Sequence, residues 1–375
     1  MTQPLDVCIR GAGIVGRTLA LLLAGEKLRV GLVAQPAMAS HSDVRAYALN
    51  AASRGLLESL RVWPDEQHAT PVRHMRIHGD AGGAVSFDAQ AHGVQALAWI
   101  VDVPALEARL TDAVRYQPLI EVLDRPQAAA LTVICEGKSS ATRAEFATGY
   151  ELLPYGQQAI ACRLDCEIPH QQTAWQWFAD GQILAFLPLS GPQGNSVAVV
   201  WSVQEDRAAA LLALAEAEFA QALENASGGA LGHLTLQGPR LAWPLQMARA
   251  QRWTGVTAGQ AWALAGDAAH AVHPLAGQGL NLGLADVAEL AQVLREREAW
   301  RSPGDARLLR RYERARQSDV LALGTASDGL QRLFARGEAP WPSLRNWGMK
   351  GFERSNALKN WVARRAMGLA DGRKE

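Results

Sequence analysis

The N-terminal segment 5–33 constrains the fold more than any other part of the chain. Residues 5–10 (LDVCIR) predict a buried strand that runs directly into Gly11-Ala12-Gly13-Ile14-Val15-Gly16. An apolar helix is predicted over 14–23 and a second strand over 28–33. In such a β-α-β unit the GxGxxG glycines let a dinucleotide pyrophosphate approach the helix N-terminus. The candidate contacts are Gly11, Gly13, Ile14, Val15 and Gly16.

A second glycine-rich segment, GDAAHAVHPLAGQGLNLGLAD over 266–286, lies near the other end of the chain. A strand is predicted to end at 263–265, which places Asp267 at its tip, and Gly277 and Gly279 precede a helix that begins at Leu280. The positive end of that helix favours an anion, such as the pyrimidine side of a reduced flavin. The Asp267 carboxylate can accept hydrogen bonds from ribityl hydroxyls. Together the two loops predict a flavin dinucleotide site.

With these loops, four further stretches resemble the class A flavoprotein aromatic hydroxylases, and within them the ubiquinone-biosynthesis hydroxylases. The stretches are DVRAYALN over 43–50, YGQ over 155–157, the run from Pro169-His170 to Ala174-Trp175, and AMGL over 366–369. The resemblance covers nearly the whole chain. It implies that Asp267 contacts the ribityl chain, that Pro274 lies against the flavin ring, and that Arg45 lies near the FAD phosphates. The cofactor contacts implied beyond the first turn are Arg45, Asp267, Pro274, Gly277, Gln278, Gly279, Leu280 and Asn281.

The resemblance also implies a fold and an activity. The fold class is α/β, with a Rossmann-like FAD-binding domain, an inserted mixed or antiparallel β-sheet substrate domain and a C-terminal helical segment. The implied activity is hydroxylation of an aromatic ring, a prenylated phenol of ubiquinone biosynthesis. NADPH or NADH reduces FAD, and dioxygen then forms a flavin C4a-hydroperoxide. Since the cofactor carries out the difficult step, no catalytic side chain is selected from the sequence.

Three positions near the cofactor depart from the family pattern. The second strand ends in Ala34-Gln35, where an acidic residue usually binds the adenosine ribose; Gln35 remains a candidate contact through neutral hydrogen bonds. Pro104 stands where relatives usually place a flavin-contacting arginine, although proline suits a first helical turn. Glu136 replaces the aspartate of a DGxxSxxR segment that contacts FAD and the nicotinamide donor.

These departures, with a short connection between Pro104 and Glu136, leave two alternatives to an active hydroxylase. One is a degenerate, non-catalytic partner of a quinone-biosynthesis complex. The other is a flavoenzyme of different chemistry on the same fold. Retained flavin and substrate-dependent NAD(P)H oxidation distinguish the first alternative from the hydroxylase.

The composition predicts a two-domain protein of the cytoplasm. The 375 residues are 49% apolar and 20% charged with no net charge, which suits a large core and gives no sign of nucleic-acid binding. No apolar run reaches the roughly twenty residues of a membrane span, and the chain begins with a strand rather than a signal peptide. Residues 1–72, 102–154 and 240–300 are predicted to form the FAD-binding domain, 73–101 and 155–239 the substrate-binding sheet domain, and 301–375 a C-terminal helical region.

Within the sheet domain, one sheet over the flavin ring is expected, followed by a helix over 205–226. Its predicted strands are 74–78, 84–87, 96–101, 159–166, 173–178, 183–187 and 197–203. The last segment, 341–375, holds eight Lys or Arg against three Asp or Glu. Either this segment packs on the protein with a solvated basic face, or it contacts the inner face of a membrane; the resemblance favours membrane contact.

Several side chains invite a metal or stacking interpretation that we do not favour. His270 and His273 flank the cofactor turn, where a histidine more often makes a structural hydrogen bond, and Cys162 and Cys166 have no second pair of ligands. No metal site is predicted. Four cysteines fit a reducing compartment. The tryptophans of the predicted strands are expected in the core or as pocket walls: Trp175, Trp177 and Trp201.

Overall fold

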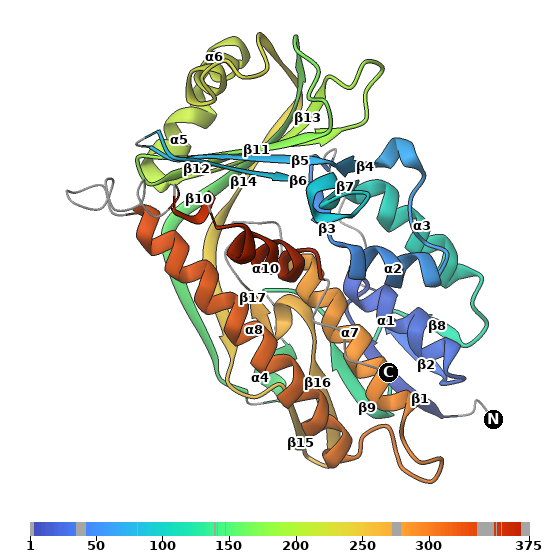
Figure 1. The fold of residues 1–375 in the computed structure, drawn as a ribbon. Coiled ribbons are helices and arrows are strands. Elements are labelled where there is room, and N and C mark those ends of the chain that lie inside the picture. The colour runs from blue at the N-terminus through green and yellow to red at the C-terminus, as the bar shows by residue number, and fades with distance from the viewer. Residues whose placement is uncertain are drawn as a thin grey trace.

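The computed structural model describes residues 4–34, 43–80, 82–138, 140, 142–146, 148–271, 279–335, 349, 351–353 and 355–368. It confirms the α/β fold class. A six-stranded sheet forms the cofactor half of the molecule (Figure 1). Its five parallel strands are joined by one antiparallel edge strand, in the order β15 (Thr254–Thr257), β16 (Gln260–Leu264), β9 (Ala129–Ile134), β1 (Leu5–Arg10), β2 (Val30–Val33) and β8 (Ile120–Leu123).

The β-α-β unit predicted at the N-terminus is confirmed. Strand β1 pairs in parallel with β2 on one side and β9 on the other, and helix α1 (Ile14–Gly25) connects β1 to β2. Val7, Cys8 and Ile9 have no solvent exposure, so β1 is buried on both of its faces. Helix α1 packs against α7 (Gly279–Arg295) and α3 (Val103–Arg115), and α8 (Ala306–Ala335) packs against α7.

An eight-stranded mixed sheet forms the second half of the molecule. All neighbouring strands are antiparallel except β11 and β5, which are parallel. The order is β17 (His270–Ala271), β14 (Leu234–Ala250), β10 (Tyr150–Cys166), β13 (Ser196–Gln204), β12 (Gln182–Leu189), β11 (Thr173–Ala179), β5 (His74–His78) and β6 (Ala84–Asp88). Strands β10 and β14 are long enough to run from this sheet down toward the cofactor half (Figure 1).

The structure differs from the expected single sheet at one strand. Strand β7 (Ala98–Asp102), expected beside the others, forms a separate three-stranded antiparallel sheet with β3 (Ala46–Leu49) and β4 (Ala69–Val72). Ala98 and Ile100 pack with Ala174 and Leu189 of the large sheet, so the small sheet lies between the two halves. The exact domain limits remain a prediction; β14 crosses the limit expected at residue 240.

The helix expected over 205–226 is two helices, α5 (Glu205–Ala213) and α6 (Glu216–Ala226). Leu214 between them is extended, because Arg240 Nη1 of β14 binds the Leu214 carbonyl oxygen (2.9 Å) and Glu218 accepts a hydrogen bond from Ala215 N (3.1 Å) to start α6. Both helices cover the face of the large sheet that is turned away from the cofactor half (Figure 1).

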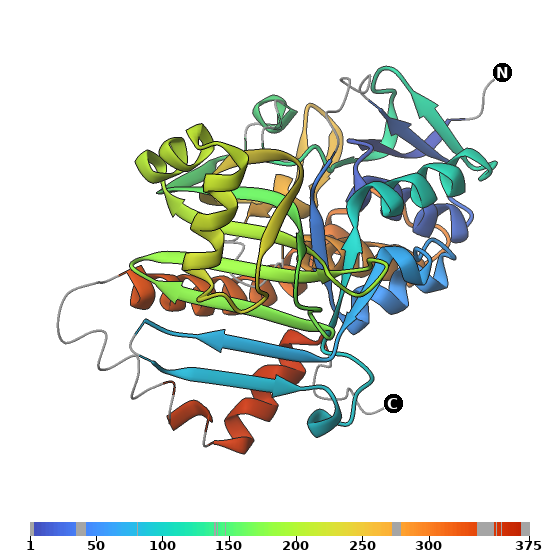
Figure 2. The same ribbon diagram turned by 90° about the horizontal axis from the view of Figure 1, so that it is seen from above.

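The C-terminal helix α10 (Asn356–Ala366) lies beside the β5–β6 edge of the large sheet (Figure 2). Lys359 Nζ pairs with Glu353 (2.9 Å), and Glu353 accepts a hydrogen bond from Ser86 Oγ on β6 (3.1 Å). The remaining short elements are α2 (Ala51–Ser59), α4 (Thr142–Glu145) and the 3-10 turns Glu66–His68, Gln90–His92 and Gly266–Ala268.

Candidate cofactor site

The three glycines of the first turn have different surroundings. A Cβ atom on Gly11, whose φ is +111°, would lie 2.6 Å from the carbonyl oxygen of Cys135, and one on Gly16 would lie 1.9 Å from the carbonyl oxygen of Gly11. Both positions therefore allow close approach of β1, β9 and α1. Gly13, the N-cap residue of α1, has nothing within 4 Å of a Cβ position. Its open side leaves room for a ligand at the positive end of α1.

Val15 joins this turn to the second glycine segment. A Cβ on Gly266 would lie 3.4 Å from both Val15 methyl groups, and a Cβ on Gly283 of α7 would lie 2.9 Å from Val15 Cγ2. The first turn of α1 thus packs directly on the turn that carries Asp267. Both turns follow the carboxyl ends of parallel strands, β1 and β16, which is where open α/β sheets bind ligands.

The Asp267 carboxylate is in an unusual position. It makes no hydrogen bond to any side chain or amide in the described part of the chain. Burial raises the pKa of Asp267 above its ordinary value; Lys138 and His270 oppose that rise, and Asp286 adds to it. A half-buried carboxylate that receives no hydrogen bond from the described residues fits a ligand that brings its own donors, such as the hydroxyls of a ribityl chain.

Asp286 of α7, by contrast, is fully satisfied. It has no solvent exposure and accepts hydrogen bonds from Gly266 N (2.9 Å), His270 Nε2 (2.6 Å) and Arg316 Nε (2.8 Å). Burial alone would raise the pKa of Asp286, but His270 and Arg316 outweigh it and lower the pKa. Asp286 therefore fixes the residue directly before Asp267. Gly266 has a φ of +63°, so its conformation needs such support.

Two further side chains hold the carbonyl groups of the same turn. Tyr150 donates from its hydroxyl to the Asp267 carbonyl (2.9 Å), and Arg143 Nη1 donates to the Ala268 carbonyl (3.2 Å). The Arg143 guanidinium also lies over the Tyr150 ring, 3.5 Å from its centre. Arg143 of α4 and Tyr150 of β10 thus complete the support of the Asp267 turn.

The sequence analysis missed the roles of Asp286, Arg316 and Tyr150. One signal was present for Asp286: a carboxylate within an apolar helix repeat, whose neighbours Leu282, Val287 and Leu290 are all buried, indicates a buried charge with a partner. Nothing in the sequence indicated that the partner is Arg316, thirty residues away.

Glu136, which replaces the expected aspartate, has its carboxylate occupied by the protein. Ser140 Oγ and Thr142 Oγ1 each donate to it at 2.7 Å, and Arg10 Nε lies 3.4 Å from Oε1. The longer Glu136 side chain therefore stabilises the loop on which it lies. Pro104 lies in the first turn of α3, as expected for proline, and is exposed.

The other predicted contacts divide into three groups. Arg45 is described and pairs with Asp43, and Gly279, Leu280 and Asn281 form the start of α7. The Asn281 side chain has a structural role, because it accepts from Ser53 Oγ (2.7 Å) and donates to the Ala48 carbonyl (2.8 Å). The predicted contacts that lie outside the described residues are Gln35, Pro274, Gly277 and Gln278.

The side chains set aside as metal or stacking candidates have structural surroundings. His270 binds Asp286 and stacks on Trp253 with ring centres 4.9 Å apart, which confirms the structural interpretation; His273 lies outside the described residues. All four cysteines are buried and unpaired, and burial raises the pKa of the Cys162 thiol to about 12. Among the described residues, no three His, Cys, Asp or Glu side chains group as metal ligands do.

Trp175, Trp177 and Trp201 lie on the face of the large sheet that α5 and α6 cover. Trp201 is buried, and Trp175 and Trp177 stack with ring centres 5.9 Å apart against the residues under α5 and α6. The interpretation of these residues as pocket walls is therefore wrong, and packing between the sheet and these helices explains them.

The fold and this site define a flavin-binding α/β protein with a second, sheet-based domain. Comparison with known proteins agrees. A family model described as "FAD binding domain" matches residues 127–325. Ubiquinone hydroxylase UbiL of Rhodospirillum rubrum is 32% identical over 97% of this chain and 89% of its own length. The 3-demethoxyubiquinol 3-hydroxylase of Escherichia coli is 30% identical over 98% of this chain and 99% of its own.

The crystal structure of p-nitrophenol 4-monooxygenase PnpA from Pseudomonas putida has the same fold, with a TM-score of 0.76, full coverage of both chains and 16% identity. The chain belongs to the FAD-binding-domain family and, within it, to the class A flavoprotein aromatic hydroxylases. It is an FAD-dependent monooxygenase with NAD(P)H as electron donor.

Proposed function

We propose that this enzyme hydroxylates the ring of a prenylated phenol in ubiquinone biosynthesis, with dioxygen as the oxidant and NADPH or NADH as the donor. The names of its relatives, a ubiquinone hydroxylase and a demethoxyubiquinol hydroxylase, support the pathway. The balanced reaction consumes NAD(P)H, a proton, dioxygen and the phenol, and yields NAD(P)⁺, water and the hydroxylated ring. When bound, FAD supplies the hydride acceptance and the oxygen activation.

The observation that carries the proposal is the pair formed by Gly13 and Asp267. The open side of Gly13 at the N-terminus of α1 suits a pyrophosphate. The half-buried Asp267 carboxylate, which receives no hydrogen bond from the described residues, suits ribityl hydroxyls. Val15 packs between the two turns, so both groups belong to one site. The predicted contacts of Arg45, Gly279, Leu280 and Asn281 with FAD are part of this proposal.

An absorption spectrum tests the cofactor site. We expect the purified protein to bind FAD, and Asp267→Ala to lose it. Asp112→Ala is the matched control, because Asp112 is an exposed carboxylate on α3 without a hydrogen bond from the described residues. FAD retained equally by both variants would contradict the role of Asp267.

Product analysis then tests the reaction. We expect a prenylated phenol to accelerate NAD(P)H oxidation and to yield one hydroxylated ring for each NAD(P)H consumed. Bound FAD with no substrate that accelerates NAD(P)H oxidation would favour the non-catalytic partner instead. The occupied Glu136 carboxylate is the specific observation behind that second candidate.

Contact with a membrane surface through 341–375, and with other proteins of a quinone-biosynthesis complex, belongs to the same proposal. On α10, the exposed residues include Trp361, Arg364 and Arg365, and the Arg365 guanidinium lies 5.7 Å from the Trp361 ring centre. A half-exposed tryptophan beside arginines suits an anionic lipid surface. No helix in the described part of the chain is long and apolar enough to cross a membrane.

Sedimentation with anionic and neutral vesicles tests the surface. We expect binding to anionic vesicles only, and weaker binding for Trp361→Ala. Co-purification with the other enzymes of the pathway from cells tests the complex, and a protein that purifies alone would contradict that part of the proposal.

A further inference from the structure

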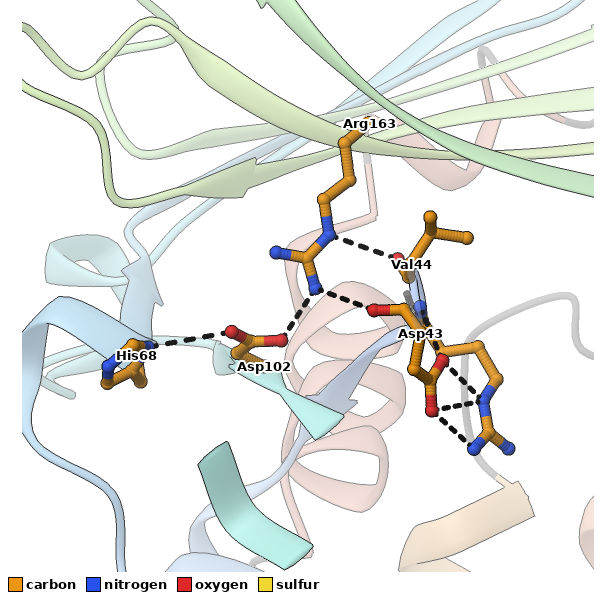
Figure 3. Close-up of polar contacts among 6 residues, drawn as sticks. Asp43, Val44, His68, Asp102 and Arg163 are labelled. Carbon is orange, nitrogen blue, oxygen red and sulfur yellow. Dashed lines mark hydrogen bonds and ion pairs between the residues drawn. The ribbon is translucent and has the colours of Figure 1, made fainter. Parts of the chain in front are cut away.

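Arg163 connects the large sheet to the cofactor half through a single guanidinium group. It lies on β10, paired with Ala198 of β13, and its side chain leaves the sheet toward β3 and β7 (Figure 3). Nη2 donates to Asp102 Oδ1 at 2.6 Å and to the Asp43 carbonyl at 3.5 Å, and Nε donates to the Val44 carbonyl at 3.3 Å. Three acceptors on two separate segments thus meet on one side chain.

The carbonyl groups that Arg163 binds belong to the segment that presents Arg45. Asp43 holds the Arg45 guanidinium at both carboxylate oxygens, with Nε at 2.9 Å from Oδ1 and Nη2 at 2.6 Å from Oδ2. Asp43 Oδ1 also accepts a hydrogen bond from Arg45 N at 3.0 Å. Arg163 therefore binds the backbone of this segment (Figure 3), while the Asp43 carboxylate holds the Arg45 guanidinium.

Asp102 anchors the other side of the contact. It is the last residue of β7 and the N-cap of α3, and it is paired with Ala46 of β3, directly after Arg45. Val103 N donates to the Arg45 carbonyl at 3.3 Å. His68 Nδ1 lies 3.5 Å from the second Asp102 oxygen. Asp102 is therefore already tied to Arg45 through the backbone, so a contact from Arg163 to Asp102 also fixes Arg45.

The surroundings of Arg163 allow a substitution that removes its hydrogen bonds without disturbing a packed core. A cavity of about 300 Å³ lies beside the guanidinium, lined largely by polar side chains that include His68, Thr70 and Gln237. Arg163 is part-buried, with 28% of its side chain exposed. An uncharged side chain of similar length at 163 therefore meets no packed core and removes mainly the three hydrogen bonds, including the charged one with Asp102.

We infer that Arg163 is a positioning residue, which holds the 43–45 segment from the substrate sheet so that Arg45 is fixed for the FAD phosphates. The inference rests on the proposed cofactor site, since it takes Arg45 as a phosphate contact. In this inference Arg163 acts through Arg45 and not through a contact of its own with FAD. Because β10 belongs to the substrate sheet, this contact ties the cofactor phosphate region to the domain that binds the phenol.

A double-mutant cycle on FAD affinity tests the inference. The dissociation constant of FAD is measured by flavin fluorescence for the apoprotein of wild type, Arg163→Met, Arg45→Met and the double variant. We expect Arg163→Met to weaken FAD binding about tenfold, and Arg45→Met at least as much. The double variant should bind FAD no more weakly than Arg45→Met alone, because Arg163 acts through Arg45.

Arg249→Met is the matched control, since Arg249 is an exposed arginine of the neighbouring strand β14 whose side chain makes no hydrogen bond to a described residue. Arg163→Lys keeps the charge and should recover part of the affinity, which a loss of folding would not explain. If Arg163→Met does not fold, Asp102→Asn removes the anchor with little change of shape, and the same cycle with Arg45→Met applies.

Losses that multiply in the double variant, or equal affinities for Arg163→Met and Arg249→Met, overturn the inference. Full FAD affinity in Arg45→Met overturns it as well, because the route through Arg45 is then absent. Hydroxylation by the wild-type protein is measured separately. Failure of that assay refutes the proposed substrate, and the FAD affinities of the mutant cycle can still be interpreted. If the enzyme is active but the FAD affinities do not show the expected coupling, only the role of Arg163 is refuted.

Discussion

Asp286 offers the sharpest test of what holds the cofactor turn together. Asp286→Asn keeps the shape of the side chain, but it replaces one acceptor oxygen with a donor and removes the negative charge opposite Arg316. Arg316 is 7% exposed, so its charge stays buried. Removing one partner of a buried ion pair costs about 3–5 kcal/mol. Since Asp319 also accepts from Arg316 at 2.8 Å, we expect the lower end, about 3 kcal/mol of unfolding free energy.

Urea unfolding of the apoprotein, followed by tryptophan fluorescence, measures this loss. Arg295→Met is the control, because it removes an exposed ion pair with Glu26 and should cost less than about 1 kcal/mol. In the double variant Asp286→Asn/Arg316→Met, the total loss should be smaller than the sum of the single losses by about 1–3 kcal/mol. If the urea midpoint of Asp286→Asn coincides with that of Arg295→Met, the reasoning is refuted.

Three further predictions concern the same turns. Gly16→Ala should destabilise the apoprotein by more than about 1 kcal/mol, because its Cβ would lie 1.9 Å from the Gly11 carbonyl oxygen. Gly13→Ala should leave stability unchanged and weaken FAD binding. Equal stability losses of the two variants in urea unfolding would contradict this. Asp267→Asn should stabilise the apoprotein at pH 7 while weakening FAD binding, because the raised pKa of Asp267 means that its ionised form costs stability above about pH 4; a less stable variant would oppose this. The lowered pKa of Asp286 means that its contribution is present above about pH 4 and is lost as the pH falls through its folded value, so the wild-type and Asp286→Asn unfolding free energies should converge at low pH.

The parts of the fold that follow from neighbouring residues could be predicted. Strands β1 and β5 have the predicted limits, because an apolar or alternating stretch ends at a turn signal within a few residues. The order strand, turn and helix predicts glycines at 11, 13 and 16, and the structure explains Gly11 and Gly16 by close packing of the backbone. The cofactor contacts of all three glycines stay a prediction.

The parts that depend on distant residues could not be predicted. The helix over 205–226 has no internal breaker, and the break at Leu214 comes from Arg240 of another strand. Strand β7 has an ordinary strand sequence, and its partners β3 and β4 lie far from it in the chain. Periodicity predicts that a strand forms, but pairing depends on contacts that no local pattern encodes.

The two carboxylates of the 266–286 segment explain how the site combines stability with binding. Asp286 receives three donors, and its pKa is lowered, so its charge stabilises the turn. Asp267 receives none from the described residues, and burial raises its pKa although Lys138 and His270 oppose the rise, so its ionised form costs stability. Donors from a ligand remove that cost. In the proposed cofactor site, part of the FAD binding energy would come from satisfying Asp267, and Asp286 would contribute because it holds the turn in place before the ligand arrives.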